Sequence, residues 1–234
     1  DLVSGSGGRA SLMAQLQNPR RLLDPDEVHP LAQWLGPVLR RQLVHQPAAL
    51  ALLALDEGPL LLQQQPEGWL LATNQGQPDL SAVDDQLKAQ GLAQSDLSGD
   101  GESIQVWTRL TRQRGRSAGV EASLAMARST DADRDWWAET LPALMQRQDL
   151  RSLEPREQQW RNLSHHQASP VQALMLAAQP ARTVLAEWKP WALLQAMAGQ
   201  TLQPRIQGLS LGLEVDRQDE GSSVLPLHAR LELG

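Results

Sequence analysis

The chain has 234 residues, a net charge of −6, and neither Cys, Phe nor Tyr beside eight Trp. This length can bury the core of one large domain or two small ones. The acidic balance argues against a general nucleic-acid binder, and the missing Cys exclude disulfides, thiolate nucleophiles and Cys-based zinc sites. No apolar run approaches the roughly 18 to 20 residues that span a bilayer, so the sequence predicts a soluble domain.

The N-terminal part is expected to hold a lead-in and a helix. A Gly-rich stretch within residues 1–17 interrupts periodic patterns and predicts a mobile segment. Helical spacing predicts a helix over residues 31–43, interrupted at Pro37. Residues 48–55 form a continuous apolar run, which is typical of a strand buried on both faces.

A unit of two strands and a helix is predicted next. Residues 60–65 and 69–73 suit two strands, and Pro-Glu-Gly between them suits a turn. A short helix is expected over residues 80–90, with Asp79 or Ser81 as its N-cap.

The same order of elements is predicted a second time. Residues 104–110 and 120–126 alternate apolar and polar side chains, as a hairpin does. Asp131 or Asp133 would cap a helix that continues to Gln148. The two units start about 45 residues apart and share a pattern of elements, not residue identities.

The C-terminal unit is predicted as a strand over residues 171–177, a helix over 181–199 broken at Pro190, and a hairpin over 205–234. Leu residues alternate with polar ones along both arms of the hairpin, so its apolar face needs covering. The most economical architecture is α+β, a mainly antiparallel sheet built from ββα-like units with helices packed on one face.

The domain boundaries follow from these elements. Residues 1–47 are interpreted as the lead-in and its helix, and residues 48–234 as the α+β domain. The repeated order also allows two similar subdomains, at about 48–150 and 165–234.

Two acidic motifs were weighed as metal sites. Residues 96–101 (DLSGDG) resemble the opening of a calcium loop, but Trp107 stands where a bidentate carboxylate should close it, so a turn is expected. Asp131, Asp133 and Asp135 also alternate, and carboxylates at a helix start are usually caps. We therefore predict neither a metal nor a cofactor.

Catalytic residues are also not predicted. His165 and His166 adjoin Ser164, but adjacent residues do not face each other on a helix or strand, and no Gly-x-Ser-x-Gly elbow occurs. A hydrolase-like enzyme of unknown substrate remains an alternative, and it would gather these histidines or His228 with an acidic partner in a cleft. An apolar-ligand or lipid-binding protein, with an open apolar cavity, is the other alternative.

Trp and Arg side chains are the candidates for a binding surface. Exposed Trp suits interfaces with proteins or lipid headgroups, although Trp could instead supply the core bulk that Phe and Tyr usually provide. An Arg run at a hairpin tip could grip phosphate groups or could simply aid solubility. The candidate binding residues are Trp136, Trp137, Trp188, Trp191, Arg109, Arg112, Arg114 and Arg116.

Several stretches resemble a known family. They are GPLLLQQQPEGWLLAT from Gly58, VDDQLKAQGL from Val83, IQVWTRL from Ile104, WKPWALLQAMAGQ from Trp188, and the closing QGLSLGLEV and LHARLELG. Together they are similar to uncharacterised cyanobacterial proteins that share a domain of unknown function, over most of residues 48–234. The resemblance implies the C-terminal portion of a longer protein with an N-terminal hydrophobic segment. It also implies tethering to a membrane outside the cytosol, in the thylakoid lumen or periplasm, and it supplies no catalytic residues.

The sequence thus predicts a non-catalytic binding or scaffold module that acts with a protein partner at or near a cyanobacterial membrane. A protein partner and an anionic membrane surface both suit the Trp and Arg residues, whereas the net charge of −6 disfavours nucleic acid.

Overall fold

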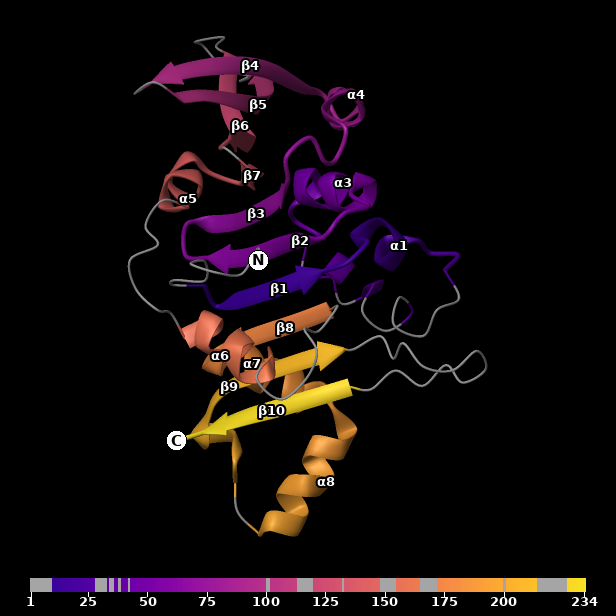
Figure 1. Cartoon of the computed structure of the whole chain (residues 1–234), viewed down its shortest axis with the longest axis vertical. Helices are drawn as coiled ribbons and strands as arrows, with labels where there is room; N and C mark the ends of the chain where they lie inside the picture. The colour runs from indigo at the N-terminus through magenta and orange to yellow at the C-terminus, as the bar shows by residue number, and fades with distance from the viewer. Residues whose placement is uncertain are drawn as a thin grey trace. The chain divides into compact units, whose positions relative to one another are not determined.

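The computed structural model describes residues 10–27, 33, 36–37, 39–41, 43–99, 102–112, 120–131, 133–147, 155–164, 172–199, 201–213 and 227–234. In chain order its elements (Figure 1) are β1 (Leu12–Leu16), α1 (Pro19–Leu23), α3 (Pro47–Leu55), β2 (Leu60–Gln65), β3 (Gly68–Asn74), α4 (Leu80–Ala89), β4 (Leu92–Gly99), β5 (Glu102–Arg112), β6 (Val120–Thr130), β7 (Arg134–Ala138), α5 (Leu141–Gln146), α6 (Pro155–Ser164), β8 (Gln172–Ala177), α7 (Ala178–Glu187), α8 (Lys189–Ala198), the 3₁₀ turn η1 (Gln203–Arg205), β9 (Ile206–Leu213) and β10 (Leu227–Leu233).

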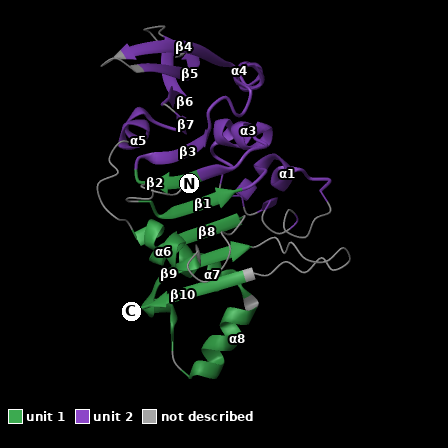
Figure 2. Ribbon diagram, viewed as in Figure 1, with its two compact units in different colours: residues 1–16, 62–66, 149–234 green, residues 17–61, 67–148 purple. Residues whose placement is uncertain are grey.

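The chain divides into two compact units, which Figure 2 colours separately. Unit 1 comprises residues 1–16, 62–66 and 149–234, and unit 2 comprises residues 17–61 and 67–148. Both units combine helices with antiparallel strands. The predicted α+β class with an antiparallel sheet is therefore confirmed.

The strands of unit 1 follow the order β10-β9-β8-β1-β2. β9 and β10 form the predicted terminal hairpin, in which Leu209 lies opposite Leu231. Helices cover the apolar side of this hairpin, since Leu209 packs in one cluster with Leu185 of α7 and Trp191 of α8. The covering that the Leu alternation required is thus supplied by α7 and α8.

A bulge near the start of β9 brings Ile206 into the same cluster. Glu232 lies opposite Gly208 while Leu233 lies opposite Ile206, so Gln207 is the extra residue on β9. An extra residue reverses the alternation of side chains, which puts Ile206 on the side of Leu209.

α6 lies against the other side of β9, so helices meet both faces of this half of the sheet. Nε2 of Gln159 donates to the carbonyl of Leu176 at 3.4 Å and to Oε2 of Glu232 at 3.0 Å. A Cβ placed on Gly208 would meet that same Nε2 at 2.2 Å. α6 is therefore a helix with a buried side, on which Gln159 and Trp160 lie.

Residues 12–16 form the strand β1 and do not belong to a mobile lead-in, so the prediction is wrong for this part of the chain. Met13 and Leu16 are buried, and Met13 lies opposite Met175 of β8. The partner strand is remote in sequence, so the local pattern could not reveal the pairing. Residues 1–9 lie outside the described residues, and the predicted helix over residues 31–43 is described only in part.

The strands of unit 2 follow the order β3-β7-β6-β5-β4. The strand and helix that the sequence predicted over residues 69–73 and 80–90 are confirmed by β3 and α4, and Asp79 caps α4 by accepting the N–H of Ser81 at 3.0 Å. The core of this unit contains three fully buried Trp side chains, namely Trp69, Trp107 and Trp137.

Residues 48–55 belong to the helix α3 and not to the predicted strand. Pro47 occupies its first turn, where proline is well tolerated, and Ala and Leu are strong helix formers. Ala49, Leu52 and Leu53 are completely buried. A helix that is apolar all round has no polar stripe, so periodicity cannot distinguish it from a buried strand.

The predicted helix from Asp131 to Gln148 is also wrong over its first half. Asp131 accepts the backbone N–H of Asp133 and of Arg134, and it thereby caps the turn between β6 and β7. The helix α5 begins only at Leu141, where the side chain of Thr140 accepts the N–H of Ala143 at 3.1 Å.

The expected turn at residues 96–101 is wrong as far as the structure describes it, because residues 96–99 lie in β4 and pair with β5, and residues 100 and 101 lie outside the described residues. In the part of the chain that the structure describes, no helix has the length and apolarity needed to cross a membrane.

Candidate functional site

The helix α8 forms from strong helix formers and has clear ends. Ala, Leu, Gln and Met dominate it, Pro190 stands in its first turn, and Gly199 ends it with a φ of 63°. At the junction of α7 and α8, the N–H of Trp188 donates to the carbonyl of Leu185, and the N–H of Trp191 donates to the carbonyl of Trp188. These bonds turn the chain between the two helices. The predicted break near Pro190 is confirmed.

One side of α8 is fixed to the rest of unit 1. Trp191 is buried, and its Nε1 donates to Oε1 of Gln203 at 3.0 Å. Gln195, one turn further along, donates to the same oxygen at 3.0 Å, while Nε2 of Gln203 donates to the carbonyl of Arg182 at 2.9 Å. Gln203 thus ties α8 to α7.

The opposite side of α8 is exposed and apolar. Leu193, Leu194 and Met197 are exposed by 62, 49 and 76%, and Trp188, which immediately precedes the helix, is exposed by 51%. Leu193, Leu194 and Met197 share one face of the helix because their spacing is i, i+1 and i+4. We call these four residues the α8 apolar surface.

The stretch of sequence that contains most of the α8 apolar surface is also uncharged. No Asp, Glu, Lys or Arg occurs over residues 190–204. Scattered exposed apolar residues are ordinary, but four of the ten large exposed ones among the described residues lie on this short stretch. Such a concentration is typical of an interaction surface.

The other Trp candidates lie inside the protein. Trp136, Trp137 and Trp191 are buried, and Nε1 of Trp137 donates to Oγ1 of Thr73 at 3.2 Å. The ring of Trp137 stacks on that of Trp107 with centroids 5.9 Å apart. These rings supply core bulk, so of the four Trp candidates only Trp188 presents a large exposed area.

The Arg candidates are described only in part. Arg109 is exposed on β5 opposite Ser123 of β6. Arg112 ends β5, and Arg114 and Arg116 lie outside the described residues.

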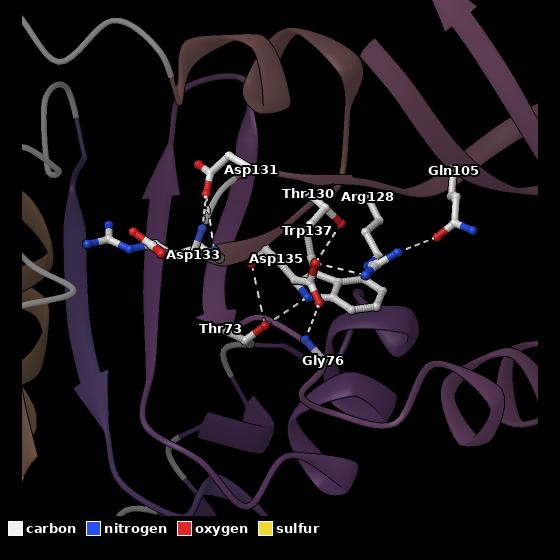
Figure 3. Close-up of polar contacts among 10 residues, drawn as sticks. Thr73, Gly76, Gln105, Arg128, Thr130, Asp131, Asp133, Asp135 and Trp137 are labelled. Atoms are coloured by element: carbon white, nitrogen blue, oxygen red, sulfur yellow. Dashed lines mark hydrogen bonds and ion pairs between the residues drawn. The ribbon is translucent and has the colours of Figure 1, made fainter.

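Three alternating aspartates of unit 2 have different surroundings, which Figure 3 shows. Oδ1 of Asp135 accepts from Arg128 at 2.8 Å and from Thr130 at 2.7 Å, and its Oδ2 accepts the N–H of Gly76 at 3.0 Å. Asp135 is therefore a buried carboxylate with both oxygens satisfied. Asp131 serves the turn and Asp133 is exposed, so the three do not converge on one point.

A second buried carboxylate lies at the end of α3. Oδ1 of Asp56 accepts the N–H of Gly58 at 2.9 Å, whereas its Oδ2 is buried and has no hydrogen-bond partner. Burial raises the pKa of Asp56 to about 6, against the opposing effect of the Gly58 N–H. This group titrates near neutral pH.

Among the residues that the structure describes, the candidate side chains for hydrolysis or metal binding do not come together in one place. His165 and His166 lie outside that range, and His228 lies on β10. No group of three or more His, Asp or Glu in the described chain could hold a metal ion.

Sequence reasoning missed Leu193, Leu194 and Met197. Apart from Lys189 and Gln195, α8 carries only apolar residues, and such a helix is normally expected to be buried, so periodicity gave no sign that these three side chains are exposed. The absence of charge over residues 190–204, next to a single Lys189, was the available sign.

Comparisons with known proteins agree with the fold. The structure titled "Structure of crystal form I of TP0453" is similar with a TM-score of 0.50 and 11% identity, covering 100% of this chain and 79% of that one. Crystal form IV of the same protein has a TM-score of 0.43 and 11% identity, covering 93% and 76%. At this identity the likeness to form I supports the fold alone. The comparison with curated proteins found no match.

The model of one protein family matches residues 42–228, which is most of the chain. This match confirms the resemblance as far as a domain of unknown function is concerned. The chain belongs to the family described as "Protein of unknown function (DUF3352)".

Proposed function

We propose that this protein is a non-catalytic binding module that inserts the α8 apolar surface into an apolar groove of a protein partner. The observation that carries the proposal is the exposure of Leu193, Leu194 and Met197 on one face of a helix whose opposite face is anchored. Helices with apolar anchors at such spacing bind grooves in this way.

The anchored side of α8 makes it suitable for recognition. Trp191 and Gln195 both donate to Gln203, so α8 is held in a helical conformation before a partner arrives. A preformed helix loses less conformational entropy on binding than a segment that must fold at that moment. This favours α8 as a rigid ligand for a groove.

Charge favours a protein groove over an anionic membrane. Helices that lie on anionic lipids carry several Lys or Arg on their polar face, and α8 carries only Lys189. The chain as a whole has a net charge of −6, which repels an anionic surface. We therefore propose that the protein partner, and not direct contact with lipid, places this protein near a membrane.

The test is photo-crosslinking in native cells, with a photoreactive amino acid at position 197 of the full-length chain. We expect a discrete protein adduct, whose protein is then identified, purified and titrated. Leu194→Gln and Met197→Gln should each weaken that purified interaction by about tenfold, as substitutions of central interface residues do.

Met145 provides the matched control, because it is also an exposed Met but lies on α5 in unit 2. The photoreactive group at position 145 should give no such adduct, and Met145→Gln should leave the affinity unchanged. Equal adducts at positions 145 and 197 would refute the proposal. If the protein binds lipid vesicles and Met197→Gln abolishes this binding, the α8 apolar surface binds a membrane and not a protein groove.

A further inference from the structure

The strand β4 ends the strand order of unit 2 with one side unpaired. It pairs with β5 from Leu92 to Gly99, and no strand of the described chain pairs with its other side (Figure 1). All side chains from position 93 to position 98 are exposed. Its outer N–H and C=O groups are therefore available to another extended chain.

Natural edge strands usually carry features that prevent such pairing, and β4 has few of them. Lys, Pro and bulges are common devices, yet the sequence of β4 is LAQSDLSG and its pairing with β5 is regular. β10, which ends the strand order of unit 1, differs: it carries Arg230 and Glu232, and its register shifts at Glu232. Asp96 is the one charged residue of β4.

We propose that β4 pairs with β4 of a second copy of this chain, antiparallel and centred on Ser95. This register places Gln94 opposite Asp96 of the second copy, and Ala93 opposite its Leu97. Twofold symmetry repeats both pairs. Each protomer thus contributes the same edge to the interface.

The side chains of β4 complement themselves in this register. The amide of Gln94 can donate to the carboxylate of Asp96 of the second copy, so the two aspartates do not lie directly opposite each other. On the other face Leu97, exposed by 44% in the single chain, covers Ala93 of the second copy. Position 95 is Ser, a small residue that permits close approach at the centre.

The mass of the 234-residue chain in solution tests the proposal first. We expect light scattering or sedimentation to give twice 25.7 kDa at high concentration and a shift towards the monomer on dilution. Ser95→Lys places two like charges opposite each other and should raise the dissociation constant by on the order of tenfold. Ala229→Lys, on the exposed edge strand β10, is the matched control and should leave it unchanged.

Cysteine crosslinking tests the register, since the chain has no Cys of its own. Ser95→Cys puts two thiols on directly opposite residues, with Cβ atoms about 5 Å apart. Leu97→Cys puts them four residues apart, about 13 Å, which exceeds the reach of a disulfide. Oxidation should therefore link Ser95→Cys at least about tenfold faster than Leu97→Cys.

Each contrary result is decisive, provided that urea unfolding shows the variants to be folded. A monomeric mass at every concentration would overturn the proposal. So would a dimer that Ser95→Lys leaves intact. Equal crosslinking rates at positions 95 and 97 would indicate random collision and would overturn the register.

Discussion

Arg128 donates a hydrogen bond from Nη2 to Oδ1 of Asp135 over 2.8 Å, and Asp135 is almost completely buried. The guanidinium carbon of Arg128 also lies 5.2 Å from the centre of the Trp137 ring, and its Nη1 donates to Gln105 at 2.6 Å. These contacts join β5, β6 and β7 in the core of unit 2. The Arg128–Asp135 pair therefore stabilises the core of unit 2, and removing it should measurably lower the stability of the protein.

Asp135→Asn is expected to destabilise the protein by about 3 to 5 kcal/mol, because it leaves the guanidinium of Arg128, which is only 14% exposed, without its counterion. Urea unfolding followed by Trp fluorescence measures this loss. Asp133→Asn, at an exposed position two residues earlier, should change stability by less than about 0.5 kcal/mol. Similar losses for the two variants would contradict the structural role of Asp135.

Asp56 should make stability decrease as the pH rises through about 6. Its pKa is raised from 3.8 to about 6 in the folded chain, so the folded state favours the protonated acid. The contribution is complete below about pH 4 and is lost above about pH 6, where burying the carboxylate costs up to about 3 kcal/mol.

Asp56→Asn removes this cost and should raise the unfolding free energy at pH 8 by about 1 to 3 kcal/mol, with little gain at pH 4. Urea midpoints at both pH values measure the difference. Asp133→Asn, at an exposed carboxylate that does not contribute to the raised pKa of Asp56, is the control and should leave the pH dependence unchanged. If the unfolding free energy of Asp56→Asn changes between pH 4 and 8 as much as that of the wild type, Asp56 is not the group that causes this change.

Truncation of Trp191 is expected to destabilise the protein much more than truncation of Trp188. Trp191→Ala leaves a cavity in the cluster that Trp191 forms with Leu185 and Leu209, and it removes the donor to Gln203, so we expect a loss of about 3 to 5 kcal/mol. Trp188→Ala removes an exposed ring and should cost less than about 1 kcal/mol. Thermal unfolding distinguishes them, and an equal loss for both would contradict the exposure of Trp188.

Gly208→Ala tests the contact of α6 with β9. The new Cβ would approach Nε2 of Gln159 to 2.2 Å and Oε2 of Glu232 to 2.6 Å, so we expect a loss of about 1 to 3 kcal/mol. In a double-mutant cycle, Gln159→Ala should relieve part of this cost and give a coupling energy above about 0.5 kcal/mol. Additive losses would place Gln159 away from Gly208.

Local pattern was sufficient for elements whose two sides differ. The hairpin of β9 and β10 could be predicted because Leu209 and Leu211 alternate with Ser210 and Gly212, and α4 because its cap and its apolar spacing agree. It was insufficient where both sides are buried, as in α3, and where a partner remote in sequence decides, as in β1.

The candidate surface shows the same division. The sequence identified Trp188 and Trp191 but could not separate them, because two Trp three residues apart look alike until Gln203 takes up one indole N–H. Composition, alternation and capping by themselves determined the α+β class and the terminal hairpin, and the family resemblance rests on particular stretches of sequence. Only the tertiary structure decided which Trp is buried, that α3 is a helix, and that Leu193, Leu194 and Met197 are exposed. Periodicity records which side chains share a face, whereas burial depends on what packs against that face from elsewhere in the chain.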